Sequence, residues 1–224
     1  MKKQSLILQA IAKLLMGMVI IGVLVFFSAG SVHYWQGWIF MSTLFVPMLF
    51  AGAVLAIKNP TLLQKRLYAK EREKEQQAVV KWSGLLFVVA FVVAGLNWRW
   101  QWWILPEWVT WVSVVVFIGS YALYGEVLCE NMYLSRTIEV QEEQRVIDSG
   151  VYSIVRHPMY TATIFLFLSM PLILGSLISF LLMLVYLPLI VVRIKHEEEL
   201  LTEELCGYKE YRQRVRYKLF PGIW

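Results

Sequence analysis

Long uninterrupted apolar segments constrain this chain more than any other feature. Crossing the hydrocarbon core of a bilayer takes roughly 20 residues of helix, and only helices and closed barrels satisfy the backbone there. The segments lack the alternation that is typical of barrel strands, so helices are favoured. The sequence therefore predicts an all-α, polytopic membrane helix bundle of about six transmembrane helices, at about residues 5–29, 35–57, 82–98, 108–129, 160–175 and 178–194.

The distribution of Lys and Arg predicts how these helices are oriented. Residues 58–81, residues 130–159 and the tail from residue 193 are rich in Lys and Arg, whereas the opposite side has Arg99 alone. Basic loops favour the cytoplasm, so we expect both termini and a polar C-terminal tail there. The net charge of +5 then reflects orientation and anionic lipid, and no nucleic-acid partner is expected. Five tryptophans form an expected interfacial belt on the outer side: Trp98, Trp100, Trp102, Trp103 and Trp108.

Three local features complete this outline. Cys129 and Cys206 lie in segments that we place in the cytoplasm, so both are expected to be free thiols. Residues 65–78 have mixed charge and good helix formers, which fits either a helix on the membrane surface or a charged connector. Residues 175–177, Gly-Ser-Leu, predict a tight turn that makes a hairpin of the last two helices.

Polar and ionisable residues gather in the second half of the chain, on the predicted cytoplasmic side. The first cluster is the stretch GVYSIVRHPMY at residues 150–160. Gly150 permits a tight turn, and Pro158 is tolerated at the first turn of a helix. Arg156 and His157 would then lie at a helix N-terminus, where unpaired N–H groups favour an anion. A plain helix cap with an interfacial arginine explains the pattern equally well.

Two further clusters contain charged residues one helical turn apart. Arg193 and Glu197 share a helix face, either as an ion pair or as inward-facing functional groups. Glu126 and Glu130, followed by Asn131, lie at the end of the fourth segment, and solvated carboxylates are the favoured interpretation there. The three histidines are scattered, so no metal site is expected, and no nucleotide-binding loop or hydrolase motif is present.

An ordered set of motifs resembles one family. Arg156-His157-Pro158-x-Tyr160 is followed by Arg193-x-x-x-Glu197-Glu198-x-x-Leu201 and then by Gly207-Tyr208-x-x-Tyr211-x-x-x-Val215. This set is similar to the isoprenylcysteine carboxyl methyltransferases and their phospholipid-methyltransferase relatives, which are integral membrane enzymes that use S-adenosylmethionine (SAM). The resemblance covers about residues 126–224. It divides the chain into N-terminal transmembrane helices at 1–125 and a SAM-binding region at 126–224, which together form one integral unit.

The resemblance implies roles for individual residues. Arg193 matches the family arginine that orients the acceptor, where it would hold a carboxylate. The cofactor pocket would be formed by Gln144, Arg145, Val146, Ile147, Tyr152, His157, Pro158, Met159, Tyr160 and Glu197. Displacement at a sulfonium by an acceptor that is already an anion needs alignment and desolvation rather than a general base. Two departures are Ala162, where the family often has glycine, and Cys206 before Gly207, where the eukaryotic pattern has phenylalanine.

We therefore expect a membrane-embedded, SAM-dependent methyltransferase with a lipophilic acceptor and an active site on the cytoplasmic side. Its membrane would be a bacterial inner membrane or the endoplasmic reticulum, and its oligomeric state and acceptor stay open. One alternative is an NADPH-dependent reductase of the sterol type, which shares an Arg-His-Pro-like turn. Another is a non-enzymatic transporter or scaffold, which the scarcity of charge within the apolar segments disfavours.

Overall fold

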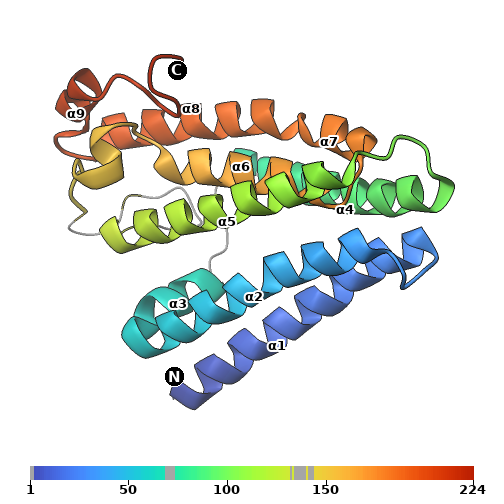
Figure 1. Cartoon of the computed structure of the whole chain (residues 1–224). Coiled ribbons are helices and arrows are strands. Elements are labelled where there is room, and N and C mark those ends of the chain that lie inside the picture. The colour runs from blue at the N-terminus through green and yellow to red at the C-terminus, as the bar shows by residue number, and fades with distance from the viewer. Residues whose placement is uncertain (1–2, 69–73, 132, 134–139, 141–143) are drawn as a thin grey trace.

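The computed structural model describes residues 3–68, 74–131, 133, 140 and 144–224. Within these residues the chain is helical, and its elements are arranged roughly parallel to one long axis (Figure 1). In chain order they are α1 (Lys3–Gly22), η1 (Val23–Phe27), α2 (Trp35–Lys58), α3 (Pro60–Tyr68), α4 (Lys74–Trp100), α5 (Glu107–Glu130), η2 (Gly150–Ser153), α6 (Pro158–Ile173), α7 (Leu177–Met183), α8 (Tyr186–Glu204) and α9 (Tyr208–Arg214).

The predicted helix bundle is confirmed, with a correction to the number of full-length spans. In the described part of the chain, five helical stretches are long and apolar enough to cross a membrane. The expected fifth segment is the shorter α6, whose 16 residues begin at Pro158 and end before Gly175, where φ is +68°. The expected sixth segment is divided into α7 and α8. Pro188 fits this break, because it has no N–H group to donate to the Leu184 carbonyl. Leu177–Glu204 as a whole is still one of the five stretches that could cross a membrane.

We call the end of the bundle that the sequence predicts to lie away from the cytoplasm the outer end. Backbone contacts between two turns hold this end together. The Leu105 amide donates to the Gly175 carbonyl at 3.0 Å, and Ile104 forms an antiparallel bridge with Ser176. The Ser176 side chain also accepts from the Ser179 amide and caps α7. The predicted turn at residues 175–177 is thus confirmed, and the turn holds the α4–α5 connection in place.

A buried apolar cluster joins the two halves of the chain near this outer end. It includes Tyr34, Phe40, Phe117 and Ile173, which come from the start of α2 and from α5 and α6. The most extensive helix pairing is that of α5 with α6. The expected division between residues 125 and 126 falls inside α5, so one helix carries the chain from the N-terminal part into the C-terminal part.

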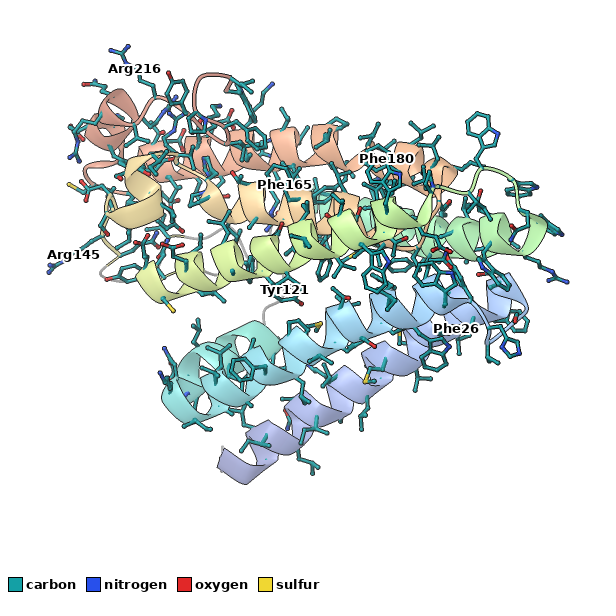
Figure 2. The ribbon with its side chains drawn as sticks, in the orientation of Figure 1. Phe26, Tyr121, Arg145, Phe165, Phe180 and Arg216 are labelled. Atoms are coloured by element: carbon teal, nitrogen blue, oxygen red, sulfur yellow. The ribbon has the colours of Figure 1, made fainter. Side chains whose placement is uncertain are left out.

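Both chain ends lie at the opposite end of the bundle. Figure 1 shows the N-terminus, α3, α9 and the C-terminus together at that end. In Figure 2, Arg145 and Arg216 project there, whereas Phe26 and Phe180 lie toward the outer end. The charged stretch expected at residues 65–78 is partly helical, in the last turn of α3 and from Lys74 in α4, and residues 69–73 lie outside the described residues. Cys129 and Cys206 are free, as expected.

Candidate functional site

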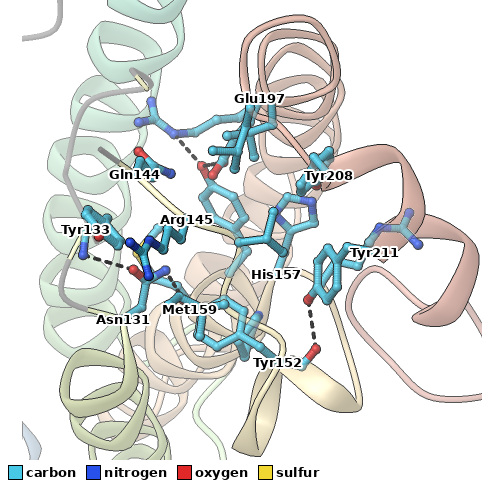
Figure 3. A pocket seen from close by; sticks show the side chains of 18 residues that line it. Asn131, Tyr133, Gln144, Arg145, Tyr152, His157, Met159, Glu197, Tyr208 and Tyr211 are labelled. Carbon is cyan, nitrogen blue, oxygen red and sulfur yellow. Dashed lines mark hydrogen bonds between the residues drawn. The ribbon is translucent and has the colours of Figure 1, made fainter. Parts of the chain in front are cut away.

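The end of the bundle that holds both chain termini is called the basic end, because Arg145 and Arg216 project there. A pocket lies at this end, between the ends of α5, α6 and α8 and the C-terminal tail (Figure 3). Its walls combine aromatic rings, charged side chains and the segment that precedes η2. The lining residues are Asn131, Tyr133, Gln144, Arg145, Val146, Ile147, Tyr152, Arg156, His157, Pro158, Met159, Tyr160, Arg193, Glu197, Leu201, Leu205, Tyr208 and Tyr211.

A buried carboxylate, Glu198, organises one wall of this pocket. Its Oε1 accepts from Arg156 Nε at 2.7 Å and from His157 Nε2 at 3.2 Å, while its Oε2 pairs with Lys218 Nζ at 2.9 Å. Only 4% of Glu198 is exposed. A buried charge is tolerated when it is paired and hydrogen-bonded, and three partners satisfy that requirement here. Glu198 therefore fixes the positions of Arg156 and His157.

The start of α6 differs from the expected anion site. The Arg156 amide donates to the Tyr217 carbonyl and the His157 amide to the Lys218 carbonyl, both at 2.9 Å. Pro158 has no N–H group, and the Tyr160 amide donates to the His157 carbonyl. The amides of Arg156 and His157 are thus both paired with the C-terminal tail, which anchors the tail to the start of α6. The prediction that His157 begins a helix is correct, whereas its backbone N–H is not available to an anion.

The Tyr160 hydroxyl connects Arg193 to Glu197. It donates to Glu197 Oε2 at 2.5 Å and accepts from Arg193 Nε at 3.0 Å. Sequence spacing left open an ion pair within one helix or inward-facing functional groups. In the structure both side chains face the pocket and are bridged by the buried Tyr160 of α6. An arginine, a phenol and a carboxylate are thereby held in a row on the pocket wall. Among the described residues, no cluster of metal-binding side chains is present.

The end of α5 supports the floor of the pocket. Glu130 Oε2 accepts from the Val151 amide at 3.1 Å, and Asn131 Nδ2 donates to the Tyr152 hydroxyl at 3.0 Å. Solvation was the favoured interpretation for the two carboxylates of this helix. It fits the exposed Glu126, whereas the half-exposed Glu130 also accepts a hydrogen bond from the η2 turn.

The turn from α8 into α9 completes the pocket from the C-terminal side. This turn, called the α9 corner, is a packed cluster of Leu205, Tyr208, Tyr211 and Val215, and Val146 of the segment before η2 packs against it. The Tyr211 hydroxyl donates to the Tyr152 carbonyl at 2.7 Å, which ties the corner to η2. Burial raises the pKa values of Tyr152 and Tyr211, so both phenols stay protonated at neutral pH.

Comparisons with known proteins find a similar family and a similar fold. Residues 111–203, from α5 to the end of α8, match the model of the isoprenylcysteine carboxyl methyltransferase (ICMT) family. This match covers less than half of the chain, and it is a similarity to the family over this segment. The matched segment contains Arg193, Glu197 and the start of α6, and it ends before the α9 corner.

A solved structure of an isoprenylcysteine carboxyl methyltransferase has a similar fold. It is the eukaryotic intramembrane Ras methyltransferase ICMT (isoprenylcysteine carboxyl methyltransferase), without a monobody. The TM-score is 0.58 at 18% identity, and the similarity covers 96% of this chain and 77% of that chain. The likeness therefore extends to the N-terminal helices as a likeness of fold. A comparison with curated protein sequences gives no significant match.

The structure brings the eleven site residues suggested by sequence to this one pocket. Arg193 and all ten expected cofactor-binding residues line it. Sequence reasoning did not assign Glu198 or Lys218, although Glu198 stands beside Glu197 in the motif. Tyr208 and Tyr211 belong to the sequence motif, which by itself assigns them no role. Lys218 had no sequence signal, because its contact depends on the path of the tail.

Proposed function

We propose that this chain is a membrane-embedded methyltransferase that uses SAM and acts on the carboxylate of a lipophilic acceptor, such as a prenylated cysteine. The observation that carries the proposal is the convergence of Arg193, Glu197 and several aromatic rings on a single pocket at the basic end of the bundle. That end is where a lipid acceptor from the bilayer and a polar cofactor from water would meet.

The pocket residues fit the chemistry of SAM, which carries an ammonium, a carboxylate, an adenosine and a sulfonium. Glu197 supplies a carboxylate for a cationic or hydroxyl group, and the Gln144 side chain supplies an amide. The rings of Tyr152 and Tyr160 offer faces for adenine or for a sulfonium, which aromatic faces attract. When bound, SAM supplies a methyl group that an acceptor oxygen displaces from sulfur.

Arg193 is the residue that would orient the acceptor. Its guanidinium is always charged and suits carboxylates, and Tyr160 fixes it through Nε. A carboxylate acceptor is already an anion at neutral pH, so no residue has to remove a proton. The work of the protein is then to align the acceptor and to exclude water.

Titration calorimetry of the detergent-purified chain with S-adenosylhomocysteine, with NADPH in parallel, tests the cofactor. We expect saturable binding of S-adenosylhomocysteine alone, weakened about tenfold in Glu197→Gln because one charge-assisted contact is lost. Glu199→Gln is the matched control, since Glu199 is an exposed neighbour on the same helix. Binding of NADPH alone would contradict the proposed cofactor and would favour the NADPH-dependent reductase.

A transfer assay tests the acceptor. Methyl-labelled SAM is supplied with either S-farnesylated N-acetylcysteine or phosphatidylethanolamine vesicles. A carboxylate acceptor gives a base-labile methyl ester, whereas an amine acceptor gives a base-stable product. We expect label in the base-labile product, and label confined to the amine lipid would contradict the proposed acceptor class.

A further inference from the structure

Tyr208 is a pocket residue whose chemistry the proposed roles leave unused. It is the first residue of α9 and follows Gly207, whose φ of +84° turns the chain from α8 into α9. Only 4% of Tyr208 is exposed, and the residue lines the pocket. Figure 3 shows its side chain beside His157 and Glu197. Residue 208 also lies beyond the segment that matches the family model.

The hydroxyl of Tyr208 is buried without a hydrogen-bond partner among the residues that the structure describes. The other pocket tyrosines of α6, η2 and α9 differ in this respect. Tyr160 donates to Glu197, Tyr152 accepts from Asn131, and Tyr211 donates to the Tyr152 carbonyl. Buried polar groups are almost always paired, because leaving one unpaired costs the free energy of its lost hydration. An unpaired hydroxyl at a pocket wall therefore points to a partner supplied by the ligand.

The surroundings of this hydroxyl define which kind of partner it needs. Burial raises the pKa of Tyr208, and the carboxylates of Glu198 and Glu197 raise it further. The phenol thus keeps its proton and acts as a donor at neutral pH. Glu198 already has three partners and Glu197 has the Tyr160 hydroxyl. The missing group is a hydrogen-bond acceptor.

We propose that the Tyr208 hydroxyl donates a hydrogen bond to the cofactor bound in this pocket, which makes the α9 corner a wall of the binding site. The inference rests on the proposed function and adds a binding residue from outside the matched family segment. The packing of Leu205, Tyr211 and Val215 holds the ring independently of the hydroxyl. Ring and hydroxyl therefore have separable tasks, one in folding and one in binding.

Two matched substitutions separate these tasks. Tyr208→Phe removes an unpaired hydroxyl, so the melting temperature without ligand should stay the same or rise. Tyr211→Phe removes the donor to the Tyr152 carbonyl, so the melting temperature should fall. Calorimetric titration with S-adenosylhomocysteine should then show binding about tenfold weaker in Tyr208→Phe, because the acceptor on the ligand is left buried and unpaired.

Each outcome of this experiment decides the inference. Unchanged affinity of Tyr208→Phe, with the parent chain binding normally, overturns the role of the hydroxyl and leaves the proposed function intact. A fall in melting temperature equal to that of Tyr211→Phe shows a structural hydroxyl and also overturns it. Failure of the parent chain to bind S-adenosylhomocysteine overturns the proposed function, and this inference with it.

Discussion

At the scale of single residues, the adjacent Glu197 and Glu198 have different surroundings and different roles. Successive residues of an α-helix point about 100° apart, so Glu197 and Glu198 cannot face the same surroundings. Glu197 lines the pocket and accepts from Tyr160, whereas Glu198 is buried between Arg156, His157 and Lys218. The motif pair is therefore one binding residue followed by one positioning residue.

Glu198→Gln should destabilise the chain because it leaves the buried Arg156 guanidinium without its anionic partner. Removing one partner of a buried ion pair costs about 3–5 kcal/mol. The measurement is thermal unfolding in detergent, followed by circular dichroism. Glu199→Gln, at an exposed site on the same helix, should change stability by no more than about 0.5 kcal/mol. Equal melting temperatures for the two variants would show that Glu198 does not organise this wall.

At the scale of elements, the pocket depends on how the end of α5 meets η2. Gly150 has a φ of +50°, and a Cβ atom there would overlap the carboxylate of Glu130. Glu130 in turn accepts from the Val151 amide, which fixes the first turn of η2. Tyr152 follows within the same turn and lines the pocket. A backbone conformation that favours glycine therefore positions a binding-site ring.

Gly150→Ala should weaken both folding and binding. It places a residue with a Cβ atom in the left-handed conformation, and this Cβ displaces the Glu130 carboxylate. The left-handed conformation alone costs about 1–2 kcal/mol for a residue with a Cβ. Gly222→Ala is the matched control, because Gly222 has a φ of +81° but open space around its Cβ position. Melting temperature and S-adenosylhomocysteine affinity are compared. If both variants behave alike, contact with Glu130 has no importance beyond the backbone strain.

At the scale of the whole molecule, both termini, α3 and α9 share one end of the bundle, and the pocket lies there (Figure 1). The tryptophan-rich α4–α5 connection lies at the other end. Basic residues concentrate at the pocket end, which the positive-inside rule assigns to the cytoplasm. A cofactor from the cytoplasm would then enter without crossing the membrane.

Cys206 reports this orientation without an added label, because it is exposed at the turn before α9. In a Cys129→Ala background, a membrane-impermeant maleimide should modify Cys206 in inside-out vesicles but not in intact cells. A second variant with His33→Cys and both native cysteines replaced should show the reverse pattern, since His33 is exposed at the outer end. Modification of Cys206 from outside would invert the proposed topology.

The sequence by itself determined the transmembrane helices and the residues around the pocket. The expected number of these helices, about six, differs by one from the five stretches that are long enough to cross a membrane. Apolar length and the distribution of Lys and Arg are local properties, so they specify membrane helices before any packing occurs. Motif order likewise grouped Arg193, Glu197 and the start of α6. The shorter α6 and the division between α7 and α8 also follow from local chemistry, at Gly175 and Pro188.

Only the tertiary structure decided which groups satisfy one another. Glu198 pairs with Lys218 twenty residues later, and the Tyr160 hydroxyl joins Arg193 to Glu197 across two helices. The unpaired Tyr208 hydroxyl is likewise visible only once every neighbouring group has been assigned its partner. Hydrogen-bond satisfaction is a property of three-dimensional neighbours rather than of spacing along the chain, so sequence patterns could name these residues but not their roles.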